Sequence, residues 1–207
     1  MRSLILIVLV SSVSACISDP YGYSTPYSDH VSEAVSVAMP DNAPSISAQM
    51  SLQSPAADAV TKSGEHRGVD IVESIGAPVL AATQATVLRS FYEPTFGHQV
   101  YLDHGTDSNG TLWVTKYRHL DTRNVAVGDK VRRGYAIGTV GKTGMMAQFF
   151  PHLHFELWQK PEGGSATPVD PNRYWLEGVG NVTCFERKHR NIPSPDKLTY
   201  PVECKDG

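Results

Sequence analysis

Two histidines alternate with large apolar residues in the stretch Pro151–Leu157, which carries the clearest chemical signal of this chain. In an extended strand, successive side chains point to opposite faces, so His152, His154 and Glu156 share one face and the apolar residues between them share the other. The two imidazoles then lie about 7 Å apart along the backbone, and one of them is well placed to ligate a metal. Glu156 either supports an imidazole of this site or forms a structural ion pair.

A histidine and a carboxylate with metal-ligand character also occur upstream, at His66 and Asp70. A spacing of four residues puts two side chains on the same side of a helix or a strand. Gly68 between them and the β-branched residues after them favour a loop that runs into a strand. Two histidine nitrogens and one aspartate oxygen would make a three-ligand zinc site with a fourth position left to water, whereas structural zinc is usually closed by four Cys or His ligands.

The elements that must position these residues are β-strands. From Thr61 to Trp175 the chain consists of short β-branched and aromatic runs separated by glycine. Their close spacing, without long amphipathic segments, predicts a mainly β fold built on a compact antiparallel sheet. The Gly-containing segment 125–134 is predicted to be a compact corner that closes the sheet. The predicted strands are Val69–Val72, Pro78–Ala82, Ala85–Tyr92, His98–Asp103, Thr111–Arg118, Tyr135–Val140 and His152–Leu157.

The first residues have the pattern of an export signal. A basic end precedes the apolar run Leu4–Val10, which is too short to span a bilayer, and small residues lead to Cys16. This stretch resembles a bacterial lipobox, which implies a lipoprotein signal peptide at 1–15 and a membrane anchor through lipidated Cys16. The alternative is an ordinary secretory signal. Either signal puts the mature protein outside the cytoplasm, and in a Gram-negative cell Ile17 favours the periplasmic side of the outer membrane.

Composition divides the rest of the chain. Residues 16–60 are rich in Ser, Pro and Ala and are predicted to form a flexible tether, because they bury too little apolar surface to offset chain entropy. One domain of ordinary size follows at 61–176, and then a Pro-rich, charged tail at 177–207. Cys184 and Cys204 form a disulfide in this tail or remain two free thiols; zinc ligation by them is disfavoured because no CxxC spacing is present. The net charge of −3 gives no support for nucleic-acid binding.

Several ordered motifs resemble the lysostaphin-like, or LytM-type, zinc endopeptidases that cut peptidoglycan peptides. The resemblance implies a LytM-type (duplicated hybrid motif-like) fold at 61–176, Zn²⁺ held by His66, Asp70 and His154, and His119 and His152 as catalytic histidines lining the cleft. The bulky residues of 145–150 stand where the family commonly has small ones, and we expect them to reshape the substrate groove. The motifs lie at Gly64–Asp70, Gly76–Val79, Tyr117–Leu120, Val127–Gly134 and His152–Glu156.

The function implied is hydrolysis of peptidoglycan cross-links, with stem peptides as the substrate and the D-alanyl to diaminopimelate bond as the expected target in a Gram-negative envelope. One of His119 and His152 is expected to deprotonate or orient water, and the other to stabilise the oxyanion or protonate the leaving amine. The sequence leaves the two roles, the oligomeric state and any activating partner open. His98 is expected to be a surface or packing residue, and His30, His104 and His189 receive no role.

Two alternatives belong to other classes. Some LytM-like domains are non-catalytic regulators that activate cell-wall amidases, and these typically lack the metal ligands that this chain has. A lipoyl-like module of an envelope transport adaptor is suggested by residues 127–141, but such a module has no need of five site residues. A zinc measurement separates this module from the peptidase.

Overall fold

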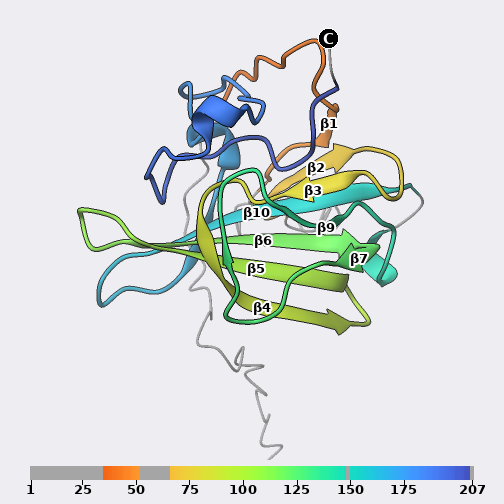
Figure 1. Cartoon of the computed structure of the whole chain (residues 1–207), viewed down its shortest axis with the longest axis horizontal. Helices are drawn as coiled ribbons and strands as arrows, with labels where there is room; N and C mark the ends of the chain where they lie inside the picture. Colours follow the sequence, from red (N-terminus) through yellow and green to blue (C-terminus); the bar gives the residue numbers. More distant parts are fainter. Residues whose placement is uncertain (1–34, 52–65, 148–149, 206–207) are drawn as a thin grey trace, which may run out of the picture.

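The structure is a computed structural model that describes residues 35–51, 66–147 and 150–205. Its frame is an eight-stranded antiparallel sheet, in which seven strands follow the order β1-β2-β10-β6-β5-β4-β8 and β11 pairs with β10 (Figure 1). The strands of this large sheet are β1 (Ile46–Ala48), β2 (Val69–Val72), β4 (Ala85–Glu93), β5 (Gly97–Thr106), β6 (Leu112–Leu120), β8 (Lys130–Val131), β10 (His152–Lys160) and β11 (Thr167–Val169).

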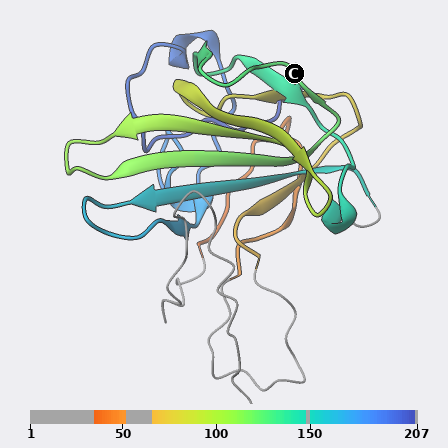
Figure 2. The same cartoon turned by 90° about the horizontal axis from the view of Figure 1, so that it is seen from below.

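A smaller sheet packs on one face of the large one. It contains β3 (Pro78–Leu80), β9 (Ala136–Thr139) and β7 (Thr122–Arg123), in the order β3-β9-β7. In Figure 2 this sheet and much of the blue C-terminal segment lie on the same side of the large sheet. The helical elements described are single 3-10 turns, η1 (Met145–Ala147), η2 (Pro171–Arg173) and η3 (Arg187–His189). Among the described residues, none of these turns has the length and apolar character needed to cross a bilayer.

The core lies between the two sheets, and alternation along β10 explains why. Leu153, Phe155 and Leu157 are each fully buried and point to the core, so the polar residues between them point to the other face. Strand β2 contributes Val69 and Ile71 to the same core. The polar face of β10 therefore has a rigid apolar layer directly behind it, which is what holds the polar side chains in place.

The C-terminal segment completes this core. Trp175 stacks on Phe155 with ring centroids 6.5 Å apart, and Tyr200 packs edge-on against Trp175 at 5.8 Å. Cys184 and Cys204 form a disulfide, so of the two arrangements that the sequence allows the structure has the bonded one. Because Phe155 alternates with the histidines of β10, this segment packs on the face of the sheet opposite to them and does not cover them.

Residues 35–51 were predicted to belong to a flexible tether, but in the structure they pair with the domain. Ile46 of β1 pairs with Ile71 of β2, and the Pro44 carbonyl accepts a hydrogen bond from the Tyr200 hydroxyl at 2.7 Å. This piece gains its order from backbone pairing with the domain, which composition cannot show. The predicted signal peptide, Cys16 and the rest of the tether lie outside the described residues.

The predicted fold class is confirmed: the regular secondary structure of the described residues is almost entirely antiparallel sheet. Each of the seven predicted strands corresponds to an observed one within a few residues, and β10 begins at the predicted residue, His152. The elements that the sequence did not reveal are β1 and the short strands β7, β8 and β11. Strand β8 belongs to the predicted corner at 125–134 and pairs with β4 at the edge of the large sheet.

Candidate metal centre

Three ligand atoms from distant parts of the chain converge on the polar face of the large sheet. The His66 Nε2 atom lies 3.0 Å from Asp70 Oδ1 and 3.1 Å from His154 Nδ1, and Asp70 Oδ1 lies 2.8 Å from His154 Nδ1. Ligands bound tetrahedrally to zinc at about 2.0–2.1 Å stand about 3.3 Å from one another. The triangle of donor atoms is therefore close to the size that one metal ion requires.

Strand register brings two of the three ligands together. His154 of β10 pairs directly with Asp70 of β2, and directly paired residues of antiparallel strands have side chains on the same face. The loop before β2 delivers His66, and Gly68 lets that loop approach β10. A Cβ atom at Gly68 would lie 2.1 Å from the Phe155 carbonyl oxygen, so a larger residue would push His66 away from the site.

Hydrogen bonds on the outer side of each ligand fix which nitrogen carries the proton. The His66 Nδ1–H donates to the Gln49 carbonyl at 2.8 Å, and the His154 Nε2–H donates to Glu156 Oε1 at 3.0 Å. Since a neutral imidazole has one N–H, His66 Nε2 and His154 Nδ1 are left with lone pairs. Two lone pairs and a carboxylate oxygen that face one another without a proton between them form a site for a cation, and the residues fit a metal ion.

The charges around the site favour ionised carboxylates. Burial by itself would raise the pKa of Asp70, but the imidazoles of His154 and His66 lower it well below its ordinary value when, without a metal, they carry a second proton and hydrogen-bond to it. Burial opposes ionisation of Glu156 as well, and the neighbouring Arg118 guanidinium, 3.1 Å away, is the largest of the influences that lower its pKa. Glu156 therefore both supports an imidazole and forms an ion pair, the two roles between which the sequence did not decide.

Two further imidazoles stand beside the ligands. The ring centroid of His119 lies 4.9 Å from that of His152 and 6.1 Å from that of His154. The His119 Nδ1–H donates to the Thr143 carbonyl at 2.9 Å, and the His152 Nδ1–H donates to the Phe150 carbonyl at 3.1 Å. Each ring is left with Nε2 as a hydrogen-bond acceptor. Burial is the main cause that lowers the pKa of His119 to about 4, so this ring is neutral at pH 7.

His119 reaches the site through an unusual backbone conformation. It is the one residue other than glycine with a positive φ, 64°, in the described ranges. Regular alternation along β6 would put Arg118 on the polar face and His119 in the core, but the left-handed conformation turns the His119 ring back toward His152. Such strain persists only where the surroundings hold it. Here the His119 N–H donates to the Phe96 carbonyl at 3.1 Å.

Thr143 is a supporting residue that sequence reasoning missed. Its carbonyl fixes His119, its hydroxyl donates to the Leu120 carbonyl at 2.6 Å, and the same hydroxyl oxygen accepts from the His98 N–H at 2.9 Å. Gly97 lets this loop come close, because a Cβ there would lie 2.1 Å from Thr143 Oγ1. The flanking glycines at 141 and 144 were the only sequence signal of this loop.

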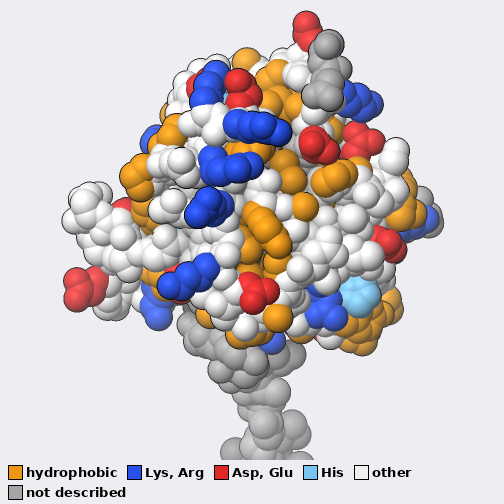
Figure 3. Space-filling view, viewed as in Figure 1, with side chains coloured by type: hydrophobic (Ala, Val, Ile, Leu, Met, Phe, Trp, Pro, Cys, Tyr) orange, Lys and Arg blue, Asp and Glu red, His pale blue; other side chains and the backbone are white. Residues whose placement is uncertain are grey.

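All five residues predicted for the site lie together, three as a possible ligand set and two beside it. Within the described ranges, no fourth His, Cys, Asp or Glu joins the group formed by His66, Asp70 and His154. His104 points to the opposite face of the sheet, and His98 stacks edge-on against Tyr92 with ring centroids 4.9 Å apart. The face seen in Figure 3, that of the small sheet, carries a row of Lys and Arg side chains, and histidine shows only near its lower right edge.

Known proteins share part of the sequence of this chain. The profile described as "Peptidase family M23" matches residues 64–171, just over half of the 207 residues. The peptidoglycan DD-endopeptidase ShyC of Vibrio cholerae is 41% identical over 92 residues, which are 44% of this chain and 20% of ShyC. Lysostaphin of Staphylococcus simulans is 36% identical over 157 residues, covering 66% of this chain and 30% of lysostaphin.

The fold agrees as well. An NMR solution structure of lysostaphin superimposes with a TM-score of 0.52 at 27% identity, covering 74% of this chain and 57% of the other. The chain spans a fifth of the length of ShyC and less than a third of that of lysostaphin. The matched residues include the three clustered ligands and both neighbouring histidines. The chain belongs to peptidase family M23.

Proposed function

We propose that this chain is a zinc-dependent endopeptidase that hydrolyses peptide cross-links of peptidoglycan. The observation that carries this proposal is the convergence of His66 Nε2, Asp70 Oδ1 and His154 Nδ1 within 3.1 Å of one another. Two nitrogens and one oxygen with a position left for water are the donor set of a catalytic zinc site rather than a structural one. The complete ligand set also argues against the non-catalytic regulator considered above.

Zinc at these three atoms would supply Lewis acidity, lowering the pKa of water toward about 7 and polarising the scissile carbonyl. The rest of the chemistry belongs to His119 and His152. Their Nδ1–H groups are held by the backbone carbonyls of Thr143 and Phe150, so both rings direct Nε2 as an acceptor. One of the two rings takes a proton from the attacking water at its Nε2 atom. The same proton then goes to the leaving amine, either directly or after transfer to Nε2 of the other ring, which in that protonated form can donate to the developing oxyanion.

The substrate is inferred from the relatives. Three matched proteins of Vibrio cholerae, ShyC, ShyA and ShyB, are named peptidoglycan DD-endopeptidases, at 41%, 37% and 35% identity. Another relative, from Staphylococcus capitis, is named a glycyl-glycine endopeptidase and is 34% identical. The identity to ShyC, 41% against 34% for the glycyl-glycine endopeptidase, favours the D-alanyl to diaminopimelate bond as the target.

The test is to digest purified sacculi with the zinc-loaded chain and to identify the bond that is cut by mass spectrometry, with a chelator-treated sample as the control. We expect cross-linked muropeptide dimers to disappear and monomers to accumulate only when zinc is present. Release of single D-alanines with the dimers intact would identify a carboxypeptidase instead. Zinc binding without any cleavage, together with stimulation of an added amidase, would identify a regulator.

We also propose that the chain is lipid-anchored through Cys16 on the periplasmic side of an outer membrane. The support is the sequence pattern alone, a short apolar run followed by small residues and a cysteine. Metabolic labelling with a palmitate analogue tests this proposal. We expect label on the wild-type chain and none on Cys16→Ser, and an unlabelled wild-type chain would contradict the anchor.

A further inference from the structure

The segment 35–51, called the N-terminal arm below, touches the metal centre from outside the family match. Its Gln49 carbonyl accepts the hydrogen bond from His66 Nδ1 at 2.8 Å. The family profile begins only at residue 64. One of the three candidate ligands is therefore oriented by a part of the chain that lies outside the family profile.

The arm holds Gln49 in place from two sides. The Asn172 side-chain amide donates to Gln49 Oε1 at 2.8 Å. Two residues further on, Ser51 and His66 exchange both backbone hydrogen bonds, at 2.8 and 2.9 Å. The Gln49 carbonyl, which accepts from the Nδ1–H of the His66 ring, is thus held in place by the Gln49 side chain and by backbone pairing with His66.

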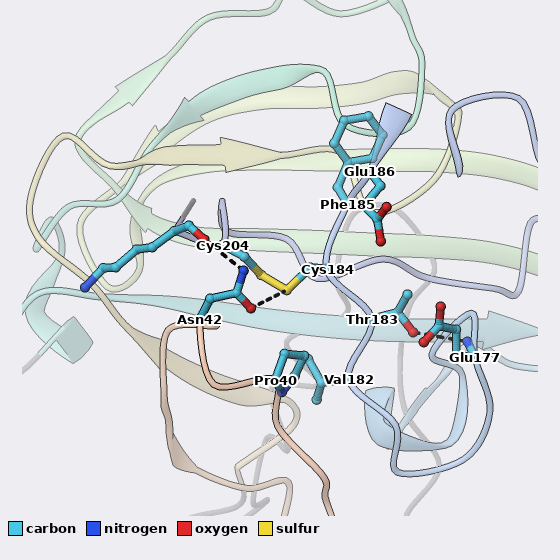
Figure 4. A pocket seen from close by; sticks show the side chains of 10 residues that line it. Pro40, Asn42, Glu177, Val182, Thr183, Cys184, Phe185, Glu186 and Cys204 are labelled. Atoms are coloured by element: carbon cyan, nitrogen blue, oxygen red, sulfur yellow. Dashed lines mark hydrogen bonds between the residues drawn. A yellow bond between two sulfur atoms is a disulfide. The ribbon is translucent and has the colours of Figure 1, made fainter. Parts of the chain in front are cut away.

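The middle of the arm is hydrogen-bonded to the disulfide-bonded C-terminal segment. The Asn42 side chain donates to the Lys205 carbonyl at 2.8 Å, and the Lys205 N–H donates to the Asn42 carbonyl at 2.9 Å. Figure 4 shows Asn42 beside the bond between Cys184 and Cys204. The arm is therefore held at two places, at Asn42 near the disulfide and at Gln49 beside the metal centre.

A metal ligand needs this kind of support. The nitrogen of a neutral imidazole that carries the proton is set by the hydrogen bond that the other nitrogen makes. A carbonyl can only accept, so Gln49 requires the proton on Nδ1 and leaves Nε2 free to bind a metal. Without that carbonyl, His66 would also populate the tautomer with a proton on Nε2, which cannot ligate.

We propose that the N-terminal arm is a positioning element of the metal centre, in which the Gln49 carbonyl fixes the tautomer and orientation of His66. This inference rests on the proposed metal-dependent function. Affinity for the metal then depends on residues outside the domain that the family profile matches. Partners that orient ligands from behind typically change metal affinity by about 10–100-fold when they are lost.

The test compares variants of the full chain in two measurements. Gln49→Ala removes the side-chain hydrogen bond from Asn172, whereas Gln49→Glu keeps an oxygen that can accept it. Ser51→Pro removes the backbone N–H that donates to the His66 carbonyl. Zinc affinity is measured by competition with a chromophoric chelator, and the His66 tautomer of the metal-free protein by long-range ¹H–¹⁵N NMR. Gln159→Ala, on the far part of β10, is the matched control.

We expect zinc affinity to fall by about tenfold in Gln49→Ala and by up to about 100-fold in Ser51→Pro, with loss of the Nδ1–H signature of His66 in both. Gln49→Glu and Gln159→Ala should bind zinc as the wild type does. Unchanged affinity and an unchanged tautomer in Gln49→Ala would overturn the inference, and this variant decides the question if Ser51→Pro does not fold. Failure of the wild type to bind zinc would instead overturn the proposed function, while the tautomer comparison in metal-free protein would still test the arm.

Discussion

The two faces of the large sheet use histidine in opposite ways. On the core face, His104 of β5 has both ring nitrogens occupied by the protein, Nδ1 by the Gln84 carbonyl at 2.9 Å and Nε2 by the Thr115 hydroxyl at 2.7 Å. The polar face carries four clustered histidines, His66, His119, His152 and His154. In each of them one ring N–H donates to a carbonyl or a carboxylate, and the other nitrogen keeps a lone pair.

This difference shows that burial does not identify a functional histidine. His104 is 9% exposed and His154 is 8% exposed. What separates them is the kind of partner at the second nitrogen, which is the Thr115 hydroxyl for His104 and the Asp70 carboxylate, 2.8 Å away, for His154. A ring held by neutral protein groups on both sides is a structural residue, whereas rings whose free lone pairs gather around one carboxylate form a site that can hold a cation.

The largest expected effect is that of His154→Ala. Removing one of three ligands should abolish zinc binding and hydrolysis together, because the remaining two atoms cannot define a site with one open position. The measurements are zinc per chain by mass spectrometry and the loss of cross-linked muropeptides. His104→Gln, on the other face, should still bind one zinc per chain. Equal zinc content in wild type and His154→Ala would refute the assignment of the ligand.

The next largest effect is that of His119→Ala, which distinguishes a catalytic histidine from a metal ligand on the same face of the sheet. His119→Ala should keep zinc and lose turnover by about 10²–10⁴-fold, since proton transfer by a positioned side chain contributes that much. Zinc content and hydrolysis rate are measured on the same sample. Loss of zinc from this variant would make His119 part of the metal site, and unchanged turnover would remove it from the mechanism.

The sequence predicted the polar face well where regular alternation carries the information. His152, His154 and Glu156 lie on one face of β10 because a strand repeats every two residues, and this repeat can be read directly from the sequence. The same rule would have put His119 in the core, since its position depends on a positive φ of 64°. Its assignment came from the family motif, because alternation alone gives the wrong face.

The supporting residues could not be predicted because they act through their backbone. Gln49, Thr143 and Phe150 each offer a carbonyl oxygen to an imidazole, and every residue type has that group. Composition was misleading for residues 35–51, where a Ser- and Pro-containing segment is ordered by pairing with β2 and with the C-terminal segment. Such pairing joins residues far apart in the sequence and leaves no local pattern.

The third prediction concerns pH and the structural histidine. Burial lowers the pKa of His104 from 6.5 to about 4. Between these values the unfolded chain binds more protons than the folded one, so the stabilising contribution is complete above pH 6.5 and is lost as the pH falls toward 4. The loss amounts to about 3 kcal/mol at this one residue.

Urea unfolding of the metal-free wild type and of His104→Gln at pH 7.5 and pH 4.5 measures this contribution. The free energy of unfolding should fall more steeply with acidification in the wild type than in His104→Gln, because glutamine does not titrate. Parallel pH dependences of the two proteins would show that His104 takes up its proton equally in both states. His104 could then no longer be treated as the buried, neutral histidine with which the polar face is compared.

The smallest expected effect is on zinc affinity. It compares Glu156, which hydrogen-bonds to the metal ligand His154, with Thr115, which hydrogen-bonds to the structural histidine His104. Glu156→Gln replaces a carboxylate that accepts from His154 at 3.0 Å and from the Trp158 indole N–H at 2.6 Å. An amide offers one acceptor oxygen instead of two, and it lacks the charge that makes the imidazole a better ligand, so zinc affinity should fall by about tenfold.

The matched change on the core face is Thr115→Val, which removes the hydroxyl that His104 Nε2 contacts at 2.7 Å. A buried nitrogen without a partner costs about 1–3 kcal/mol of folding stability, but zinc affinity should remain that of the wild type. Chelator competition and urea unfolding on both variants give the two readouts. If Thr115→Val weakened zinc binding as much as Glu156→Gln, the two faces would be coupled through β6, and support of the ligand could not be assigned to Glu156 alone.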